Sequence, residues 1–216
     1  MYFLDLLGTF AFAITGAFKA KTTKLSIFGA IFLGLITAVG GGTIRDLIIN
    51  RTPLFYLIDP NYILISTLGA IITFSVPTFF KQKYSFFRLI DSIGLSVFVI
   101  IGVSVTYNHL FANTQISINS FLSCIFLGMV TGFGGGVIRD AVMGDAPFVF
   151  RKGSNYAISS LLGAFSFYVF MFYNITVAIV VSMVITLTFR EIISKYGVYK
   201  KCFRKSKIAK KVSDTP

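Results

Sequence analysis

One seven-residue pattern occurs twice in this chain, and it constrains the fold more than any other feature. Residues 40–46 read Gly-Gly-Gly-Thr-Ile-Arg-Asp, and residues 134–140 read Gly-Gly-Gly-Val-Ile-Arg-Asp. Each copy places three glycines and then two charges inside a long apolar segment. Because glycine weakens a helix by about 1 kcal/mol per residue relative to alanine, the pattern predicts two helices that are broken at the glycines.

The composition indicates a membrane protein. The chain has 216 residues, of which 55% are hydrophobic and only 13% charged, and its mean hydropathy is +0.81. A soluble domain of this length carries more charge. The net charge of +12 comes from basic residues at segment ends and in the C-terminal tail. This distribution favours contact with anionic lipid and argues against nucleic acid as a partner.

Seven segments are long and apolar enough to span a bilayer, which needs about 20 residues each. We therefore predict an all-α protein with seven transmembrane helices. The predicted spans are residues 2–18, 25–49, 61–80, 87–107, 117–143, 155–172 and 174–194. Basic residues follow the first, third, fifth and seventh segments, which predicts an N-terminus outside the cell and a C-terminus in the cytoplasm.

The first three segments repeat as the next three. Gly134 lies 94 positions after Gly40, and the same offset carries Pro53 onto Pro147 and Tyr62 onto Tyr156; nearer the start the offset is 86, which carries Asp5 onto Asp91. Three spans is an odd number, so the second copy enters the membrane from the opposite side, as in many transporters. The predicted units are a first repeat (1–80), a second, inverted repeat (87–172), a seventh helix (174–194) and a basic cytoplasmic tail (195–216).

Broken helices would supply two kinds of binding group. The carbonyls at the end of each first half carry partial negative charge and favour a cation. The N–H groups near Thr43 and Val137, where each helix resumes, favour an anionic group such as a carboxylate. Both a cation pathway and a solute site therefore remain open at this point.

Ionisable residues at this depth need partners and are functional candidates. Adjacent helical positions point about 100° apart, so we expect neither arginine to pair with its own neighbour. We expect the ion pairs Asp5–Arg45 and Asp91–Arg139. Asp46 and Asp140 would then face the cavity or cap the resuming helix. The alternative is that all six residues form a buried structural network.

An enzymatic function has little support. The glycines lack the spacing of phosphate-binding loops, and His109 stands without a cluster of cysteines or carboxylates. Cys124 and Cys202 form no disulfide framework or zinc pattern. We therefore predict no enzyme activity, no cofactor and no metal centre.

The doubled glycine motif, the 3 + 3 + 1 plan and the basic tail resemble the prokaryotic branch of the trimeric intracellular cation (TRIC) channels. Bacterial proteins with a glycine-transporter domain label are related to them. The resemblance implies a homotrimer in the prokaryotic inner membrane, with a pore inside each protomer between the kinked second and fifth helices. It also implies conduction of K⁺, with Na⁺ as a second candidate.

The family's glycine motifs carry over onto this sequence residue by residue. On this basis the expected ion pathway includes Gly40, Gly41, Gly42, Gly134, Gly135 and Gly136. From the residues themselves we add Asp46 and Asp140, whose carboxylates would bias the cavity toward cations. The expected structural or gating charges are Asp5, Arg45, Asp91 and Arg139. The alternative function is a secondary transporter for glycine or another small solute, which would use the same site with alternating access.

Overall fold

The computed structural model is all-helical over the residues it describes, which are 1–75, 84–113, 115–151 and 155–191. Its helices are α1 (Tyr2–Thr22), α2 (Ile27–Ile48), α3 (Phe55–Ile58), α4 (Asn61–Ser75), α6 (Tyr84–Leu110), α7 (Ile118–Val142), the 3-10 turn η1 (Phe148–Phe150) and α8 (Tyr156–Phe170). Residues 175–191 form a further helix.

A helix lies within each of the seven predicted segments. α1, α2, α7 and residues 87–110 of α6 are long and apolar enough to cross a membrane. α4 and α8 are shorter apolar helices of 15 residues each. At 1.5 Å per residue, 15 residues cover about 22 Å, which is less than the hydrocarbon core of a bilayer. The last residues of the third and seventh predicted spans, 76–80 and 192–194, and the whole predicted tail lie outside the described residues.

The predicted breaks at the glycine triplets are wrong. α2 is a continuous α-helix through Gly40–Gly42, and α7 is continuous through Gly134–Gly136. Inside a bilayer, every backbone N–H and C=O must find a partner within the protein, and the helical hydrogen bond is the nearest one. This requirement outweighs the weak helix propensity of glycine.

The starts of α2 and α7 follow from serine caps. The Ser26 side chain accepts a hydrogen bond from the Gly29 backbone N–H at 3.2 Å. Ser117 and Ser120 form a reciprocal capping box at the start of α7. Each cap satisfies donors that the first helical turn leaves without partners. Serine at these two positions therefore sets where the long helices begin.

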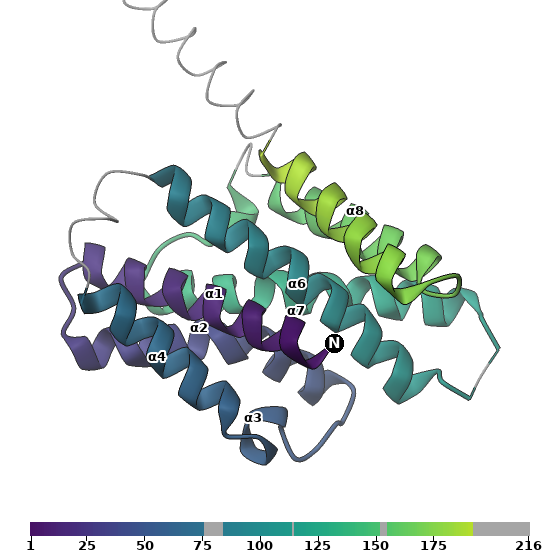
Figure 1. Ribbon diagram of the computed structural model, residues 1–216, viewed down its shortest axis with the longest axis horizontal. Coiled ribbons are helices and arrows are strands. Elements are labelled where there is room, and N and C mark those ends of the chain that lie inside the picture. The colour runs from purple at the N-terminus through teal and green to yellow at the C-terminus, as the bar shows by residue number, and fades with distance from the viewer. Residues whose placement is uncertain (76–83, 114, 152–154, 192–216) are drawn as a thin grey trace, which may run out of the picture.

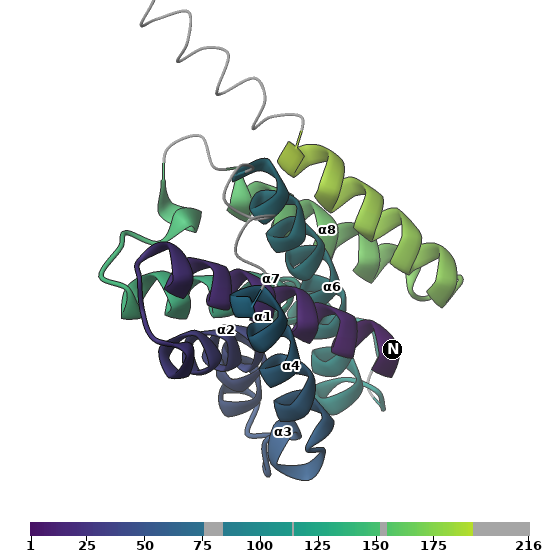
Figure 2. The same ribbon diagram turned by 60° about the vertical axis from the view of Figure 1, so that its left-hand side comes forward.

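The helices form two groups of three. α1, α2 and α4 pack against one another, as do α6, α7 and α8. In Figure 1 the purple-to-blue helices form the first group, and the teal-to-green helices lie beside it. α2 packs on α7, and α1 packs on α6, which joins the groups. The turned view in Figure 2 again places the yellow-green helix 175–191 on the outside, away from α3.

Large apolar side chains remain exposed on both groups. Phe32 on α2 is 54% exposed, and its repeat counterpart Phe126 on α7 is 59% exposed. Soluble proteins seldom leave rows of such side chains in water, whereas lipid tails or a neighbouring membrane helix accept them. The two phenylalanines therefore offer similar apolar surface to lipid or to a neighbouring helix.

Candidate functional site

α2 and α7 cross in direct backbone contact at the glycine triplets. A Cβ at Gly41 would lie 2.1 Å from the Thr131 carbonyl oxygen, and a Cβ at Gly135 would lie 2.1 Å from the Thr37 carbonyl oxygen. Positions early in α2 face positions late in α7, so the two helices run antiparallel here. Only glycine permits this approach, because any side chain would have to displace backbone rather than a flexible neighbour.

Two buried charge clusters lie about one helical turn beyond the glycines, one at each end of the crossing. We call Asp5, Arg45, Asp46 and Arg51 the first cluster, and Asp91, Arg139, Asp140 and Arg190 the second cluster. In each, the arginine and aspartate of the repeated motif are at most 4% exposed. Their positions follow directly from the antiparallel crossing and the shared spacing of the two motifs.

In the first cluster, Arg45 pairs with its own neighbour. Its Nε and Nη2 atoms each lie 2.8 Å from Asp46 Oδ1. Arg51 Nη1 approaches the other carboxylate oxygen at 3.4 Å. Asp5 makes no ion pair with Arg45; it accepts a hydrogen bond from the Tyr62 hydroxyl at 2.8 Å. The predicted Asp5–Arg45 pair is therefore wrong.

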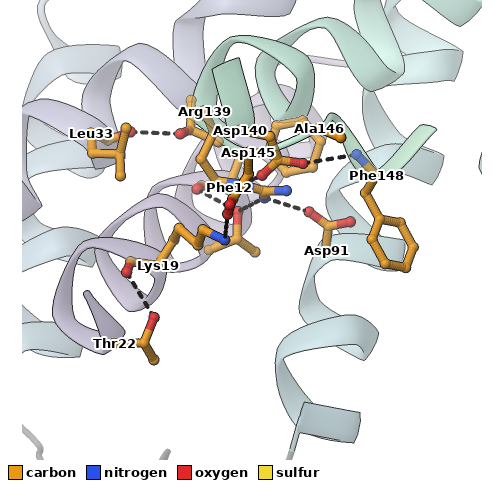
Figure 3. A network of polar contacts seen from close by, with 12 residues as sticks. Phe12, Lys19, Thr22, Leu33, Asp91, Arg139, Asp140, Asp145, Ala146 and Phe148 are labelled. Atoms are coloured by element: carbon orange, nitrogen blue, oxygen red, sulfur yellow. Dashed lines mark hydrogen bonds and ion pairs between the residues drawn. The ribbon is translucent and has the colours of Figure 1, made fainter. Parts of the chain in front are cut away.

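In the second cluster, the predicted Asp91–Arg139 pair is present, with 2.8 Å between Asp91 Oδ1 and Arg139 Nη1. Arg139 Nε also donates to Asp140 Oδ1 at 3.0 Å, so this arginine too pairs with its neighbour. Asp140 Oδ2 accepts the Phe148 backbone N–H at 2.9 Å. Arg190 Nη2 binds the remaining oxygen of Asp91. Figure 3 shows Asp91, Arg139, Asp140 and Phe148 gathered in one network, with Lys19 and Asp145 beside them.

Both arginines reach their neighbours for the same reason. Adjacent Cα–Cβ bonds do point apart on a helix, but a guanidinium has several donors on a long stem. The stem of Arg45 or Arg139 bends far enough for Nε to face the following carboxylate. This flexibility is what the prediction from helical geometry left out.

A cavity of about 210 Å³ opens beside the second cluster. It is walled by α1, α6, the end of α7, η1 and the helix 175–191. Its lining residues are Phe18, Lys19, Thr22, Phe87, Arg88, Asp91, Arg139, Asp140, Phe148, Arg151 and Arg190. Of the predicted site residues, Asp91, Arg139 and Asp140 reach this cavity. The glycines do not line it, because Gly41 and Gly135 are enclosed in the helix crossing and Gly42 and Gly136 face Phe55 and Tyr156.

The cavity wall is rich in cations, most of which have acidic partners. Lys19 binds Asp145, and Arg88 Nη2 lies 2.7 Å from Glu191 Oε2. The Lys19 ammonium group holds the pKa of Asp145, which lies in the loop after α7, below its usual value. Counting the five basic residues against Asp91, Asp140, Asp145 and Glu191 leaves one net positive charge. The cavity as it stands therefore offers no net attraction for a metal cation.

Sequence reasoning did not assign a role to four side chains that complete the clusters. Tyr62 and its counterpart Tyr156 were visible as a repeated pair, but no partner was assigned to them. Arg190 is a charge inside a predicted span and lies outside the repeat, so no symmetry pointed to it. Thr15 is buried in α1, and its hydroxyl oxygen accepts a hydrogen bond from Arg139 Nη1 at 3.1 Å.

Comparison with known proteins then places this geometry in a family. A family model described as glycine transporter matches residues 2–78 and 88–173. This chain belongs to the glycine transporter family. The two matched blocks fall on the two groups of helices. An established relative, the UPF0126 inner membrane protein YadS of Escherichia coli K12, is 32% identical over 88% of this chain and 89% of its own. The UPF0126 membrane protein YvgT of Bacillus subtilis is 35% identical over 74% of this chain and 75% of its own.

Solved structures show that this member of the glycine transporter family has the TRIC fold. The TRIC trimeric intracellular cation channel orthologue from Rhodobacter sphaeroides is 30% identical and superposes with a TM-score of 0.82, over 91% of this chain and 97% of that one. A prokaryotic TRIC channel crystallised in 0.5 M KCl is 29% identical, with a TM-score of 0.78, over 92% of this chain and 99% of that one. The resemblance drawn from the doubled glycine motif is thereby confirmed.

Proposed function

We propose that this protein is a K⁺-permeable monovalent cation channel, with the ion path inside each protomer along the crossing of α2 and α7. The observation that carries the proposal is the pair of buried charge clusters at the two ends of one glycine-lined crossing. Two pseudo-equivalent sites, joined by a seam in which the two backbones meet at Gly41 and Gly135, provide what a path across the membrane needs. The fold shared with cation channels supports the same function.

The structure changes the mechanism that the glycines would serve. Because both helices are continuous, their carbonyls at the triplets are engaged in helical hydrogen bonds and are not free to replace the hydration of an ion. We propose that the glycines instead give α2 and α7 a smooth contact, along which the helices separate when the path opens. Gly40, Gly41, Gly42, Gly134, Gly135 and Gly136 would then line the open seam.

Charge selection would come from the motif aspartates. Asp46 and Asp140 lie where the seam ends, and carboxylates at a constriction favour cations over anions. Arg45 and Arg139 would hold these carboxylates in place rather than face the ion. Asp5 and Asp91 would anchor each cluster to the neighbouring helix.

In this proposal the structure represents the closed state of the path. At the crossing, a Cβ on Gly134 would lie 3.0 Å from the Gly41 Cα atom, so no gap wide enough for an ion separates the helices. The cavity at the second cluster carries a net positive charge. Both features oppose cation passage, and opening must change them.

Assembly and location complete the proposal. The Rhodobacter sphaeroides orthologue is described as trimeric, and YadS is described as an inner membrane protein. We propose a homotrimer in the inner membrane, with seven spans, an inverted 3 + 3 repeat, an external N-terminus and a cytoplasmic basic tail that contacts anionic lipid.

The second candidate is a secondary transporter for glycine or another small solute. The name of the family model favours it, and a cavity of about 210 Å³ with arginines in its wall has room for a small carboxylate. Alternating access would expose this cavity to one side of the membrane at a time.

Flux from purified protein in liposomes separates the two functions. A K⁺ gradient clamped by a proton ionophore is measured beside uptake of radiolabelled glycine, with protein-free liposomes as the control. The channel proposal expects electrogenic K⁺ flux without glycine accumulation. Saturable glycine uptake with little K⁺ current would contradict the channel proposal and support the secondary transporter.

A further inference from the structure

One of the differences between the two repeats is a hydrogen bond made by a tyrosine. In the first, the Tyr62 hydroxyl donates to Asp5 at 2.8 Å. In the second, the equivalent residues are Tyr156 and Asp91, and the Tyr156 hydroxyl is buried without a hydrogen-bond partner in the described part of the chain. A buried hydroxyl without a partner is unfavourable, because it has lost water and gained nothing in return. The second repeat therefore holds its tyrosine away from the contact that the first repeat makes.

Arg190 takes the place of that contact. Its guanidinium carbon lies 3.8 Å from the centre of the Tyr156 ring, and its Nη2 atom binds Asp91. The side chain is only 2% exposed. It comes from the helix 175–191, which has no counterpart in the repeat. The helix 175–191, which lies outside the repeat, thus supplies a contact that the first repeat lacks.

The guanidinium is not fully satisfied where it lies. Its Nε and Nη1 atoms are buried and have no hydrogen-bond partner in the described part of the chain. Stacking on the tyrosine face compensates in part, since the face of an aromatic ring attracts a cation. A buried arginine with two donor nitrogens unpaired is held less firmly than one with every donor paired, and this suits a contact that must be released.

The Arg190 contact changes the net formal charge of the second cluster. With Arg190 in place, the formal charges of the second cluster sum to zero. Without Arg190, Asp91, Arg139 and Asp140 sum to −1, which would favour a metal cation at this end of the crossing. Arg190 therefore occupies, with a tethered guanidinium, the position at which a permeant cation would find a carboxylate.

We infer that Arg190 is an internal blocking cation of the ion path. Withdrawal of the guanidinium frees one oxygen of Asp91, while the other stays paired with Arg139. It also lets the Tyr156 hydroxyl bond to Asp91 as Tyr62 does to Asp5, removes the net positive charge of the cavity wall, and leaves the second cluster with a net charge of −1. The inference rests on the proposed channel function and adds to it the group that regulates the path.

The first test is K⁺ flux in liposomes for the full-length variants Arg190→Gln, Arg190→Lys and Lys24→Gln. Arg190→Gln should raise the rate about tenfold, the shift in population that about 1.4 kcal/mol brings. Arg190→Lys keeps the blocking charge and should stay close to the native rate. Lys24→Gln removes an exposed cation elsewhere and should leave the rate unchanged.

Folded Arg190→Gln protein with the native rate would overturn the inference. If Arg190→Gln does not fold, Tyr156→Leu removes the stacking face instead and should raise the rate; a native rate there would overturn it too.

The second test does not depend on flux. Tyr156→Phe should leave the thermal midpoint of the native protein unchanged or raise it slightly, because its buried hydroxyl has no hydrogen-bond partner in the described part of the chain. In the Arg190→Gln background the same change should lower the midpoint, because the hydroxyl has bonded to Asp91. If the midpoint shifts of Tyr156→Phe and Arg190→Gln simply add in the double variant, the inference is overturned. A different result is that the two midpoint shifts are non-additive but no variant passes K⁺. In that case the channel function is wrong, and the Arg190 contact inhibits another activity of the same site.

Discussion

Gly41 on α2 lies directly against the carbonyl oxygen of Thr131 on α7, and Gly135 on α7 lies in the same way against Thr37 on α2. The two contacts are repeat counterparts of each other. Each glycine therefore has a packing role, in which it lets the two repeats meet through their backbones.

Replacing Gly41 or Gly135 with alanine should destabilise the protein. The new Cβ would fall 2.1 Å from a carbonyl oxygen, and overpacking of this kind costs about 1–3 kcal/mol, more than the roughly 1 kcal/mol that alanine gains in helix propensity. The measurement is the free energy of unfolding in an SDS titration. Gly136→Ala is the matched control, because its Cβ would meet no backbone atom, but only side-chain ends, the Tyr156 hydroxyl at 3.3 Å and Arg139 Nη2 at 3.6 Å. Equal losses for Gly136→Ala and Gly41→Ala would contradict the packing role.

Asp91→Asn should be far more damaging than Asp5→Asn. Asp91 neutralises two buried arginines, and removal of one partner from a buried ion pair costs about 3–5 kcal/mol. Asp5 accepts one hydrogen bond from Tyr62, which asparagine can also accept, so its loss should stay near 1 kcal/mol. The same SDS titration compares the two variants. Comparable losses of unfolding free energy in the two variants would contradict the larger role of Asp91.

The Lys19–Asp145 contact should make stability depend on pH in acid. The pKa of Asp145 is lowered by Lys19, so the stabilisation is fully present above the pKa of the unfolded chain, near 3.9, and is lost as pH falls through the lower folded value. Carboxyl-carbon NMR of the detergent-solubilised protein measures this pKa. Lys19→Gln should move it upward toward the ordinary value, and an unchanged titration would contradict the contact.

Cysteine labelling tests the inverted orientation of the repeats. In a background of Cys124→Ala and Cys202→Ser, a cysteine at Thr23 should react only with reagents applied from the cytoplasm, and a cysteine at Asn113 only from outside. Both positions are exposed. Labelling of both sites from one side would rule out the alternation of basic loops as an orientation signal.

Much of this fold could be predicted from the sequence, because lipid imposes simple demands. Apolar segments of membrane length became helices, and Ser26 and Ser117 cap two of them where the segments begin. The glycine breaks were wrong because propensity scales describe helices in water, where an opened backbone can bind solvent. The seven-span count stays a prediction, since only four helices in the described part of the chain are long and apolar enough to cross.

The charge clusters were only half predictable. The Asp91–Arg139 pair followed from the repeat, because its partners recur at matching positions. Asp5–Arg45 failed although it follows from the same symmetry, because Arg45 reached Asp46 and Tyr62 reached Asp5. Arg190 was not predicted at all, because a group that occurs once leaves no pattern in a sequence built on repetition.

Single-channel recording in a planar bilayer tests the central claim, that cations cross at the contact of α2 and α7. Under a KCl gradient, the native protein should show discrete currents that reverse near the K⁺ equilibrium potential. A folded double variant, Gly41→Leu with Gly135→Leu, should show none, because leucine fills the seam. Reversal near the Cl⁻ potential, the absence of native currents, or unchanged currents in the folded double variant would contradict the account.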